Sequence, residues 1–486
     1  MIDAMRRRSY EDAESQKDSN YWSVTENNSN NAWNLNFNTG NVNNNNKYNS
    51  NVVRPVAACG GFSVFYDSVV TAYKDCLRGK MSSTQAVAYM QIAHDDLPVL
   101  ARELWDGTYH PTTSTCFLVK YPKLREVFAA NFRDRIVHHW VCLRLEPLFE
   151  ERFIAQGNVS FNCRKGFGTD ACIRHSADGM KRVSEGFRKP AWVFKGDLTG
   201  FFMSIDKGIL WYLLERFIKR WRKRYQREGW QRISSDILHR LRMKKGMPEM
   251  YWDILLATVQ KIVMHHPERD CVLNSPFPMW SGLVPNKSLF GCGEEKGEPI
   301  GNLTTQLFAN FLMSFFDEYM LFVYRRKNFS YERFVDDWCV ICDDKPFLLK
   351  TIPMMEAFLR DKLRLEMHKD KRYLQPVSHG MSFVGTYIKP NRLYLSNRTL
   401  ARFEERAIGF GRLIADKPEL TILDCKRIEQ VINSYLGFCK GKKTYAKRKE
   451  IIESMGVGLF RYFYIRGRYE SIRALRKYRE LELPCN

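Results

Sequence analysis

Two short stretches of aromatic and β-branched residues, separated by a pair of acidic positions, predict a β-hairpin in the second half of the chain. The first stretch ends at Phe334, and the second begins at Trp338 and runs to Cys342. Apolar runs of this length on either side of a polar tip are typical of two strands joined by a tight turn. Asp336 and Asp337 therefore lie at the tip of the predicted hairpin.

Another apolar run predicts a buried strand upstream. Residues 191–194 are apolar and β-prone, and Asp197 follows them before an apolar helix start. Adjacent carboxylates repel each other unless a cation lies beside them. Asp336 and Asp337 alone would also fit an acidic surface turn, but a third carboxylate at the end of a separate strand favours a divalent-metal site.

Helical periodicity accounts for most of the remaining elements. Helices are predicted within 62–106 and at 209–221, 233–243 and 251–263, and the segment from about 395 to the end is helical and basic. The apolar positions of the first segment are Phe65, Val69, Val70, Tyr73, Ile92, Leu97, Leu100 and Leu104. Together with the strands, these helices indicate an α+β fold.

Carboxylates on two strand ends suit nucleotidyl transfer, which uses two metal ions about 4 Å apart. The surrounding sequence resembles reverse transcriptases. Asp197 resembles the catalytic aspartate of the first palm motif, and Phe334-Val-Asp-Asp resembles the tyrosine-x-Asp-Asp box with Phe in place of Tyr. Further similar blocks follow the family order between about residues 60 and 465, at 123–125, 131–139, 160–169, 296–306, 365–371 and 382–385.

The resemblance implies a right-hand polymerase with fingers, palm and thumb. Residues 1–58 would form an Asn-rich, mostly disordered tail, and residues 59–190 the N-terminal helices and fingers. Residues 191–388 would form a palm, with a helical insertion at about 207–290. Residues 389–486 would form a basic helical thumb.

The resemblance also implies roles for single residues. Asp197, Asp336 and Asp337 would hold two Mg²⁺ ions, with Mn²⁺ as an alternative, and Lys371, rather than Lys369, would be the general acid. The residues expected to meet the incoming nucleotide are Lys123, Arg125, Phe202, Ile300, Gly301 and Gln306. Phe202 occupies the place of an aromatic steric gate against the 2′-hydroxyl, although a core Phe explains it equally well.

One variation points to a particular branch of the superfamily. Most members carry Gln-Gly where this chain has Ile300-Gly301. The variant resembles the reverse transcriptases of diversity-generating retroelements. Those enzymes copy a template-repeat RNA into cDNA with errors at adenines, for mutagenic retrohoming. The resemblance implies that the partners are this RNA, the cDNA product, dNTPs and a small basic oligomeric accessory protein.

The N-terminal segment is consistent with that branch. Residues 27–51 contain 14 Asn in 25 positions, and both Asn codons begin with two adenines. Its pattern of Trp, Tyr and Asn resembles the end of the lectin-like variable proteins that these retroelements diversify. We interpret it as a template repeat translated in frame; the alternative is an ordinary low-complexity tail.

The charge of the chain fits a polyanionic partner. The net charge is +22, with 76 basic and 54 acidic residues, and each neutralised phosphate would release a counterion. Basic runs lie at 219–227, 440–449 and 466–479. The residues predicted to bind nucleic acid are Arg220, Arg222, Lys223, Arg224, Lys440, Lys442 and Lys443. Each run alone would also fit a solvated helix face.

Thirteen scattered cysteines, with a single CxxC at Cys339 and Cys342, predict a reducing compartment and no zinc site. No apolar run is long enough for a membrane span, so a cytoplasmic protein without a membrane partner is expected. Two other functions stay open. The chain could be a retron-like or phage-defence reverse transcriptase, or a non-catalytic RNA-binding scaffold with a polymerase fold.

Overall fold

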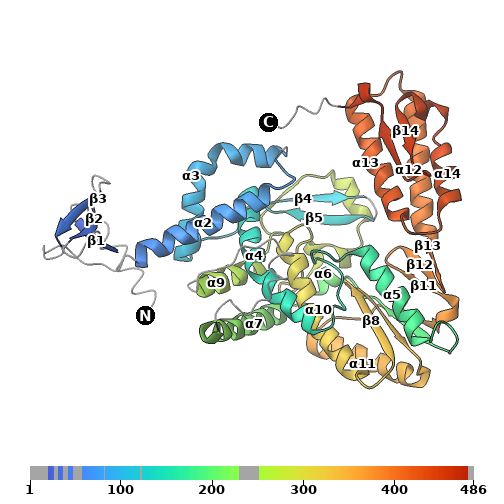
Figure 1. Ribbon diagram of the computed structural model, residues 1–486, viewed down its shortest axis with the longest axis horizontal. Coiled ribbons are helices and arrows are strands. Elements are labelled where there is room, and N and C mark those ends of the chain that lie inside the picture. Colours follow the sequence, from blue (N-terminus) through green and yellow to red (C-terminus); the bar gives the residue numbers. More distant parts are fainter. Residues whose placement is uncertain are drawn as a thin grey trace. The chain divides into compact units, whose positions relative to one another are not determined.

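The computed structural model describes residues 20–26, 31–36, 42–46, 57–81, 83–120, 123–228 and 251–479. The protein is α+β, with many helices and small, mainly antiparallel sheets (Figure 1). It divides into two compact units. The first contains residues 1–154 and 200–312, and the second contains 155–199 and 313–486. No helix within these described ranges has the length and apolar character of a membrane span.

The N-terminal segment contains three strands where the sequence led us to expect mostly disorder. β1 (Asn20–Glu26), β2 (Asn31–Asn36) and β3 (Val42–Asn46) form an antiparallel sheet in that order. Backbone pairing across a sheet does not need a large apolar core, and the expectation of a mostly disordered tail over residues 1–58 stays a prediction. The rest of the tail lies outside the described residues.

Two long helices begin the main body of the first unit. α2 (Ala57–Leu77) buries Phe65 and Val69, as predicted, and α3 (Thr84–Asp106) buries Leu97 among others. Ser83 caps α3 by accepting a hydrogen bond from the Ala86 amide. Ile92 was expected in the core but is 54% exposed. The buried stripe of α3 includes the next residue, Ala93, instead. Because one residue along a helix turns the side chain by about 100°, Ile92 points away from that stripe.

The other elements of the first unit surround a mixed three-stranded sheet of order β5-β4-β7. These strands are β4 (Ser114–Val119), β5 (Arg125–Ala129) and β7 (Cys271–Leu273). The helices are α4 (Phe132–Ala155), α6 (Phe201–Ser204), α7 (Lys207–Glu228), α9 (Trp252–Val263), and three short 3₁₀ turns, η3 (Phe277–Gly282), η4 (Pro285–Lys287) and η5 (Leu289–Gly291). The helices predicted at 209–221 and 251–263 are thus present; the one predicted at 233–243 lies outside the described residues.

Aromatic packing joins three of these helices. Phe149 of α4 stacks on Phe311 of α10 (Leu303–Tyr324) with ring centroids 4.5 Å apart. Phe217 of α7 lies 5.3 Å from Phe149 and 5.0 Å from Phe311. Such contacts add to the burial energy of each ring, so this cluster anchors α7 to α4 and α10.

The second unit is built on an antiparallel sheet of order β10-β6-β9-β8. The strands are β6 (Trp192–Gly196), β8 (Phe329–Phe334), β9 (Asp337–Cys342) and β10 (Tyr373–Pro376). β8 and β9 form the predicted hairpin, closed by the pair Phe334 and Asp337. β6 lies between β9 and β10, so the strand that leads to Asp197 is central.

Strand alternation gives this sheet two different buried faces. Val193, Cys339 and Ile341 pack with α5 (Thr169–Val183) and the hairpin of β11 (Met381–Phe383) and β12 (Thr386–Lys389). On the other face, Trp338 packs edge-on against Phe316 of α10, 5.2 Å between centroids. α11 (Lys345–Leu363) follows β9 in sequence. Cys339 and Cys342 are both buried and free.

The C-terminal part of the second unit has its own core. β13 (Arg392–Leu395) leads into α12 (Asn397–Asp416), α13 (Ile422–Cys439) and α14 (Tyr445–Glu453). The predicted helices are therefore present, but the hairpin of β14 (Phe463–Arg466) and β15 (Ser471–Ala474) was missed. Asn433 of α13 fixes this hairpin by exchanging two 2.8 Å hydrogen bonds with the Ile472 backbone. The basic residues nearby obscured its apolar alternation.

Candidate active site

The ends of β6 and β9 bring two of the predicted carboxylates together. The ladder between these strands ends with Gly196 paired to Trp338. One step further along both strands, Asp197 stands opposite Asp337. Directly opposed residues on antiparallel strands have their Cβ atoms about 5 Å apart, so register alone predicts close approach of the two acidic side chains. Asp197 is only 8% exposed.

A lysine that precedes β10 adds a cation to Asp197. Lys371 lies in the turn just before β10, which begins at Tyr373. Lys371 Nζ donates a 2.6 Å hydrogen bond to Asp197 Oδ2. We refer to Lys371, Asp197 and Asp337 as the carboxylate row. The β6–β9 register brings Asp337 to Asp197, and the Lys371 side chain reaches Asp197 from the turn before β10.

Lys195 is a second cation of the site, and the sequence analysis missed it. Its Nζ lies 3.2 Å from Asp337 Oδ1. Lys195 stands two residues before Asp197, on the same face of β6, and diagonally across from Asp337 on β9. The alternation of Lys195 and Asp197 was a visible signal, but only the β6–β9 register assigns the lysine a partner.

The third carboxylate, Asp336, lies in a strained turn beside the row. Val335 and Asp336 form a two-residue loop, and Val335 has a φ of 61°. Asp336 does not have a positive φ. A positive φ at the first loop residue alone is the pattern of a type II′ turn, in which Gly usually occupies that first position. A β-branched residue there costs on the order of 1–3 kcal/mol. Other contacts must therefore hold this turn in place.

The carboxylates of the site are short of positive charge. Burial, followed by the charges of Asp337 and Asp197, raises the pKa of the Asp336 carboxyl to about 7. Burial also raises the pKa of Asp337, although the Lys195 ammonium opposes that shift. Two lysines thus compensate three carboxylates only in part, and an additional cation would let Asp336 ionise near neutral pH.

The donor set suits a hard divalent ion. No three His, Cys, Asp or Glu side chains in the described ranges are arranged to hold one metal as they stand. Mg²⁺ needs only one or two protein carboxylates, because water and phosphate oxygens complete its octahedron. Asp197 and Asp337 with Asp336 beside them fit that requirement, and Lys371 and Lys195 occupy the oxygens that such an ion would take.

Close packing of Trp338 against Gly196 fixes the distance between the two strands that carry Asp197 and Asp337. A Cβ at Gly196 would lie 2.2 Å from the Trp338 ring, which occupies the space above this glycine. Trp338 is fully buried. The residues immediately before Asp197 and after Asp337 are therefore locked together, and any side chain at position 196 would push the two strands apart.

Two predicted nucleotide-binding residues of the first unit meet at β5. The Ile300 carbonyl accepts a 2.8 Å hydrogen bond from the Phe128 amide, and the Ile300 side chain packs on a small apolar cluster around Phe128. Gly301 has a φ of 132°, and a Cβ there would lie 2.4 Å from the Phe128 oxygen. Only glycine fits this close backbone approach.

The remaining predicted residues of that set are exposed or half-buried. Arg125 begins β5 on its exposed face, and Lys123 lies exposed in the preceding turn. Gln306 is exposed on the first turns of α10, and Phe202 is half-buried in α6. The Phe202 carbonyl accepts a 2.8 Å hydrogen bond from the Glu298 amide. Their roles toward a nucleotide stay predictions.

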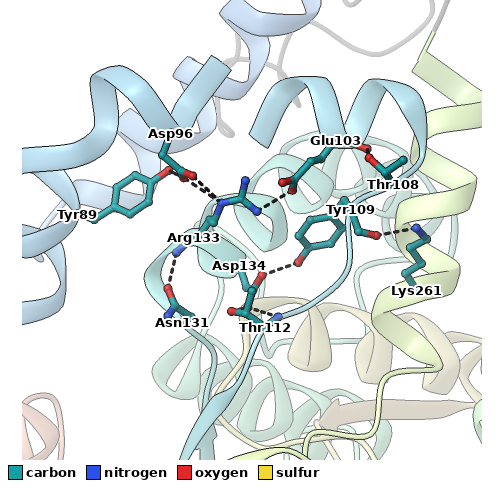
Figure 2. A network of polar contacts seen from close by, with 10 residues as sticks. All are labelled: Tyr89, Asp96, Glu103, Thr108, Tyr109, Thr112, Asn131, Arg133, Asp134 and Lys261. Atoms are coloured by element: carbon teal, nitrogen blue, oxygen red, sulfur yellow. Dashed lines mark hydrogen bonds and ion pairs between the residues drawn. The ribbon is translucent and has the colours of Figure 1, made fainter. Parts of the chain in front are cut away.

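The block at 131–139, which resembles a fingers motif, contains a structural charge cluster (Figure 2). Arg133 Nε donates to both oxygens of Asp96, and its Nη1 donates a 2.7 Å hydrogen bond to Glu103. Asp134 accepts hydrogen bonds from the Tyr109 hydroxyl and from the amide and hydroxyl of Thr112. We call these residues the Arg133 cluster. It ties α3 to the start of α4, and each of its three carboxylates accepts hydrogen bonds within the cluster.

The residues predicted to bind nucleic acid separate into two groups. Arg222 is paired with Asp253 at 2.7 Å and Arg224 with Glu151 at 3.1 Å. The Lys442 side chain is 2% exposed, with Nζ 2.6 Å from the Phe438 carbonyl. Arg220, Lys223, Lys440 and Lys443 are exposed. The exposed group is the better placed for phosphates, and nucleic-acid binding itself stays a prediction.

Comparisons with known proteins give a distant likeness. No protein-family model and no curated protein matches the chain. Among solved structures, it is similar to apo telomerase from Candida tropicalis, with 12% identity, 71% of this chain and 57% of that chain covered, and a TM-score of 0.40. It is also similar to Candida albicans telomerase in complex with a TWJ fragment of telomeric RNA, with 11% identity, 73% and 61% covered, and a TM-score of 0.39. The chain spans about 55–61% of the length of the solved structures it matches.

Proposed function

We propose that this chain is an RNA-directed DNA polymerase of the right-hand type. One observation carries the proposal. Three carboxylates at the adjoining ends of β6 and β9 lie next to a lysine in the turn before β10 that is hydrogen-bonded to one of them. Nucleotidyl transfer needs oxygen ligands from separate strands and a nearby proton donor, and the row supplies both.

The reaction joins the 3′-hydroxyl oxygen of a primer to the α-phosphorus of a dNTP, and pyrophosphate leaves. Asp197, Asp336 and Asp337 would hold two Mg²⁺ ions, or Mn²⁺ in their place, and these would supply activation of the hydroxyl and stabilisation of the leaving charge. The chain itself contributes ligand oxygens held on adjoining strand ends. Asp336 resists ionisation because it is buried, so its affinity for a cation is linked to loss of its proton.

Lys371 is placed to move a proton in this reaction. Its ammonium donates to Asp197 Oδ2, while its side chain remains 53% exposed. The exposed ammonium could also donate its proton to the departing pyrophosphate. Lys369 is also exposed. However, Lys371 makes the contact to Asp197, which supports Lys371 as the general acid.

Primer extension tests the proposal. The full chain is incubated with a DNA primer annealed to RNA, dNTPs and Mg²⁺, and the Asp336→Asn variant runs in parallel. Extension by the wild type alone supports the proposal. Extension by the variant at the wild-type rate contradicts the assigned ligands. RNA binding without extension by the wild type would favour the non-catalytic scaffold. Competition between dNTPs and rNTPs tests Phe202 as a steric gate.

We further propose that the enzyme belongs to the diversity-generating branch. The chain carries Ile300 in place of Gln, with its side chain packed on apolar residues, and an Asn-rich N-terminal segment that requires adenine-rich coding. In this proposal it copies a template-repeat RNA, errs at adenines and requires a small basic oligomeric accessory protein. The test is the neighbouring DNA. A near-copy of the coding sequence of residues 27–51, differing mainly at adenines, supports the branch, and cDNA without adenine errors favours a retron-like enzyme.

A further inference from the structure

A fully buried arginine lies one strand residue away from the acidic turn. Arg333 of β8 has no exposed surface, and neither does Asp317 of α10. Arg333 Nε donates to Asp317 Oδ1 at 2.7 Å, and Nη2 donates to Oδ2 at 2.6 Å. The Tyr331 hydroxyl adds a third hydrogen bond to Oδ1 at 2.7 Å. This bidentate arrangement fixes the plane of the guanidinium group.

The backbone of Arg333 is fixed as well. Its amide donates a 2.9 Å hydrogen bond to the Val159 carbonyl, and its own carbonyl accepts a 3.0 Å bond from the Phe161 amide. β8 is thereby paired on its outer edge up to the residue before the hairpin closes. Buried ion pairs seldom stabilise a fold better than apolar side chains would. The Arg333–Asp317 pair is therefore expected to have a role other than stability.

The remaining nitrogen of Arg333 reaches the strained turn. Nη1 donates a 3.0 Å hydrogen bond to the carbonyl of Val335. Val335 is the residue with φ 61°, and its carbonyl carbon is bonded to the Asp336 nitrogen. A hydrogen bond to this oxygen fixes the peptide plane that leads into Asp336. The arginine thus compensates for a turn residue that disfavours its own conformation.

We propose that Arg333 is a positioning residue: held by Asp317 and Tyr331, it fixes the Val335–Asp336 peptide and so aims the Asp336 carboxylate. The inference rests on the proposed function for its kinetic test, but its structural part concerns this turn alone. A glycine at position 335 would adopt positive φ without strain, so it would make the turn less dependent on the arginine.

The experiment compares Arg333→Met combined with Asp317→Leu in two backgrounds, the natural chain and Val335→Gly. The double substitution removes both buried charges together, which avoids leaving one unpaired. In the natural background, kcat for primer extension is expected to fall about 100-fold, with little change in KM for dNTP. In the Val335→Gly background, the same double substitution is expected to cost much less. Arg144→Met is a matched control, because Arg144 is also buried but donates to the Trp140 carbonyl of its own helix.

Hydrogen exchange of the peptide backbone keeps the two proposals distinguishable. The double variant is expected to exchange faster at residues 334–337 only, and the Val335→Gly background to restore protection. A kcat equal to wild type, faster exchange across the whole sheet, or an equal loss in both backgrounds overturns the positioning role. If the wild type never extends a primer while exchange behaves as expected, the proposed function fails and the positioning of Asp336 stands.

Discussion

The Arg133 cluster and the carboxylate row are both groups of acidic and basic side chains, but they differ in how their carboxylates are compensated. In the cluster, Arg133 donates to Asp96 and Glu103, and Asp134 accepts three hydrogen bonds from neutral donors. Beside the row, burial and the charges of Asp337 and Asp197 raise the pKa of Asp336 to about 7. We therefore expect the Arg133 cluster to stabilise the fold, and the carboxylates at and beside the row to bind a cation.

The difference identifies function better than residue type does. Both groups lie in segments that resemble polymerase motifs, so similarity alone would assign nucleotide chemistry to both. A saturated network has no oxygen left to offer a ligand, whereas perturbed carboxylates at strand ends are what a metal-binding site requires. The predictions below test this distinction.

Asp197→Asn is expected to have the largest effect. Primer extension should fall by at least about 10³-fold, because a ligand charge is lost where the transition state needs it. The melting temperature should not fall, since the change relieves repulsion with Asp336 and Asp337. Single-turnover extension and thermal unfolding are the measurements. Asp361→Asn, at an exposed position of α11, is the control and should change neither. Loss of stability without loss of extension would make the row structural.

Arg133→Met is expected to show the opposite pattern. The free energy of unfolding should fall by about 2 kcal/mol, because Asp96 and Glu103 lose a partly buried partner. Extension per folded molecule should be retained. Urea unfolding measures the stability, and Arg78→Met is the control, because Arg78 forms an exposed pair with Asp75 that contributes little. A specific loss of extension would place Arg133 in the nucleotide site after all.

His175 gives an intermediate case with a pH signature. Its Nδ1 lies 3.1 Å from the fully buried Glu332, and this hydrogen bond, followed by the charge of Glu332, raises the pKa of His175; Asp178 adds to the rise and Arg182 opposes it. A raised pKa stabilises the fold fully below the unfolded value of about 6.5, and this contribution disappears as pH rises through the folded value.

The melting temperature of the wild type should therefore fall more between pH 6 and 8 than that of His175→Gln. Because the His175 side chain is 49% exposed, solvent screening should keep its contribution to the free energy of unfolding below about 1 kcal/mol. Parallel pH curves for the two proteins would show that Glu332 is satisfied without the imidazolium, through Ser330 and Cys339.

Ile300→Gln should produce the smallest change in overall rate. The amide would add a polar contact of about 1 kcal/mol near the nascent pair, so errors opposite template adenine should decrease more than total synthesis. Because Ile300 packs on an apolar cluster, Ile300→Met controls for altered packing. Sequencing of cDNA from one template is the measurement, and an unchanged error spectrum in Ile300→Gln would exclude this residue from the cause of infidelity.

The elements that carry the site were predictable because their patterns are local. The hairpin at Asp336 and the strand before Asp197 follow from apolar runs and a polar tip, and the structure confirms both. The pairing of Lys195 with Asp337 was not predictable, since it depends on which residues stand opposite each other in the sheet. Arg333 was missed for a similar reason: nothing in the sequence joins it to Asp317.

The features that the sequence did not reveal lie in segments interpreted from charge or composition. The Asn-rich segment contains strands although it lacks apolar runs, and a β-hairpin lies among the basic C-terminal residues. Lys442 is buried beside Phe438 although a basic run is usually solvated. In each case tertiary contacts override the average character of the segment. The boundaries of fingers, palm and thumb, and the assignment to a retroelement branch, stay predictions.

The carboxylate row also constrains how this chain can vary in length. Side chains alternate between the faces of a strand, so deleting or inserting one residue within β6 or β9 would turn Asp197 or Asp337 to the opposite face. Many exchanges of one amino acid for another leave that parity intact. Along these strands, then, the number of residues between two positions is more strongly constrained than the identity of the amino acids at them. Divergent relatives of this chain would be recognised by unchanged intervals within the two strands, such as Lys195 to Asp197 in β6 and Asp337 to Cys339 in β9, sooner than by shared identities.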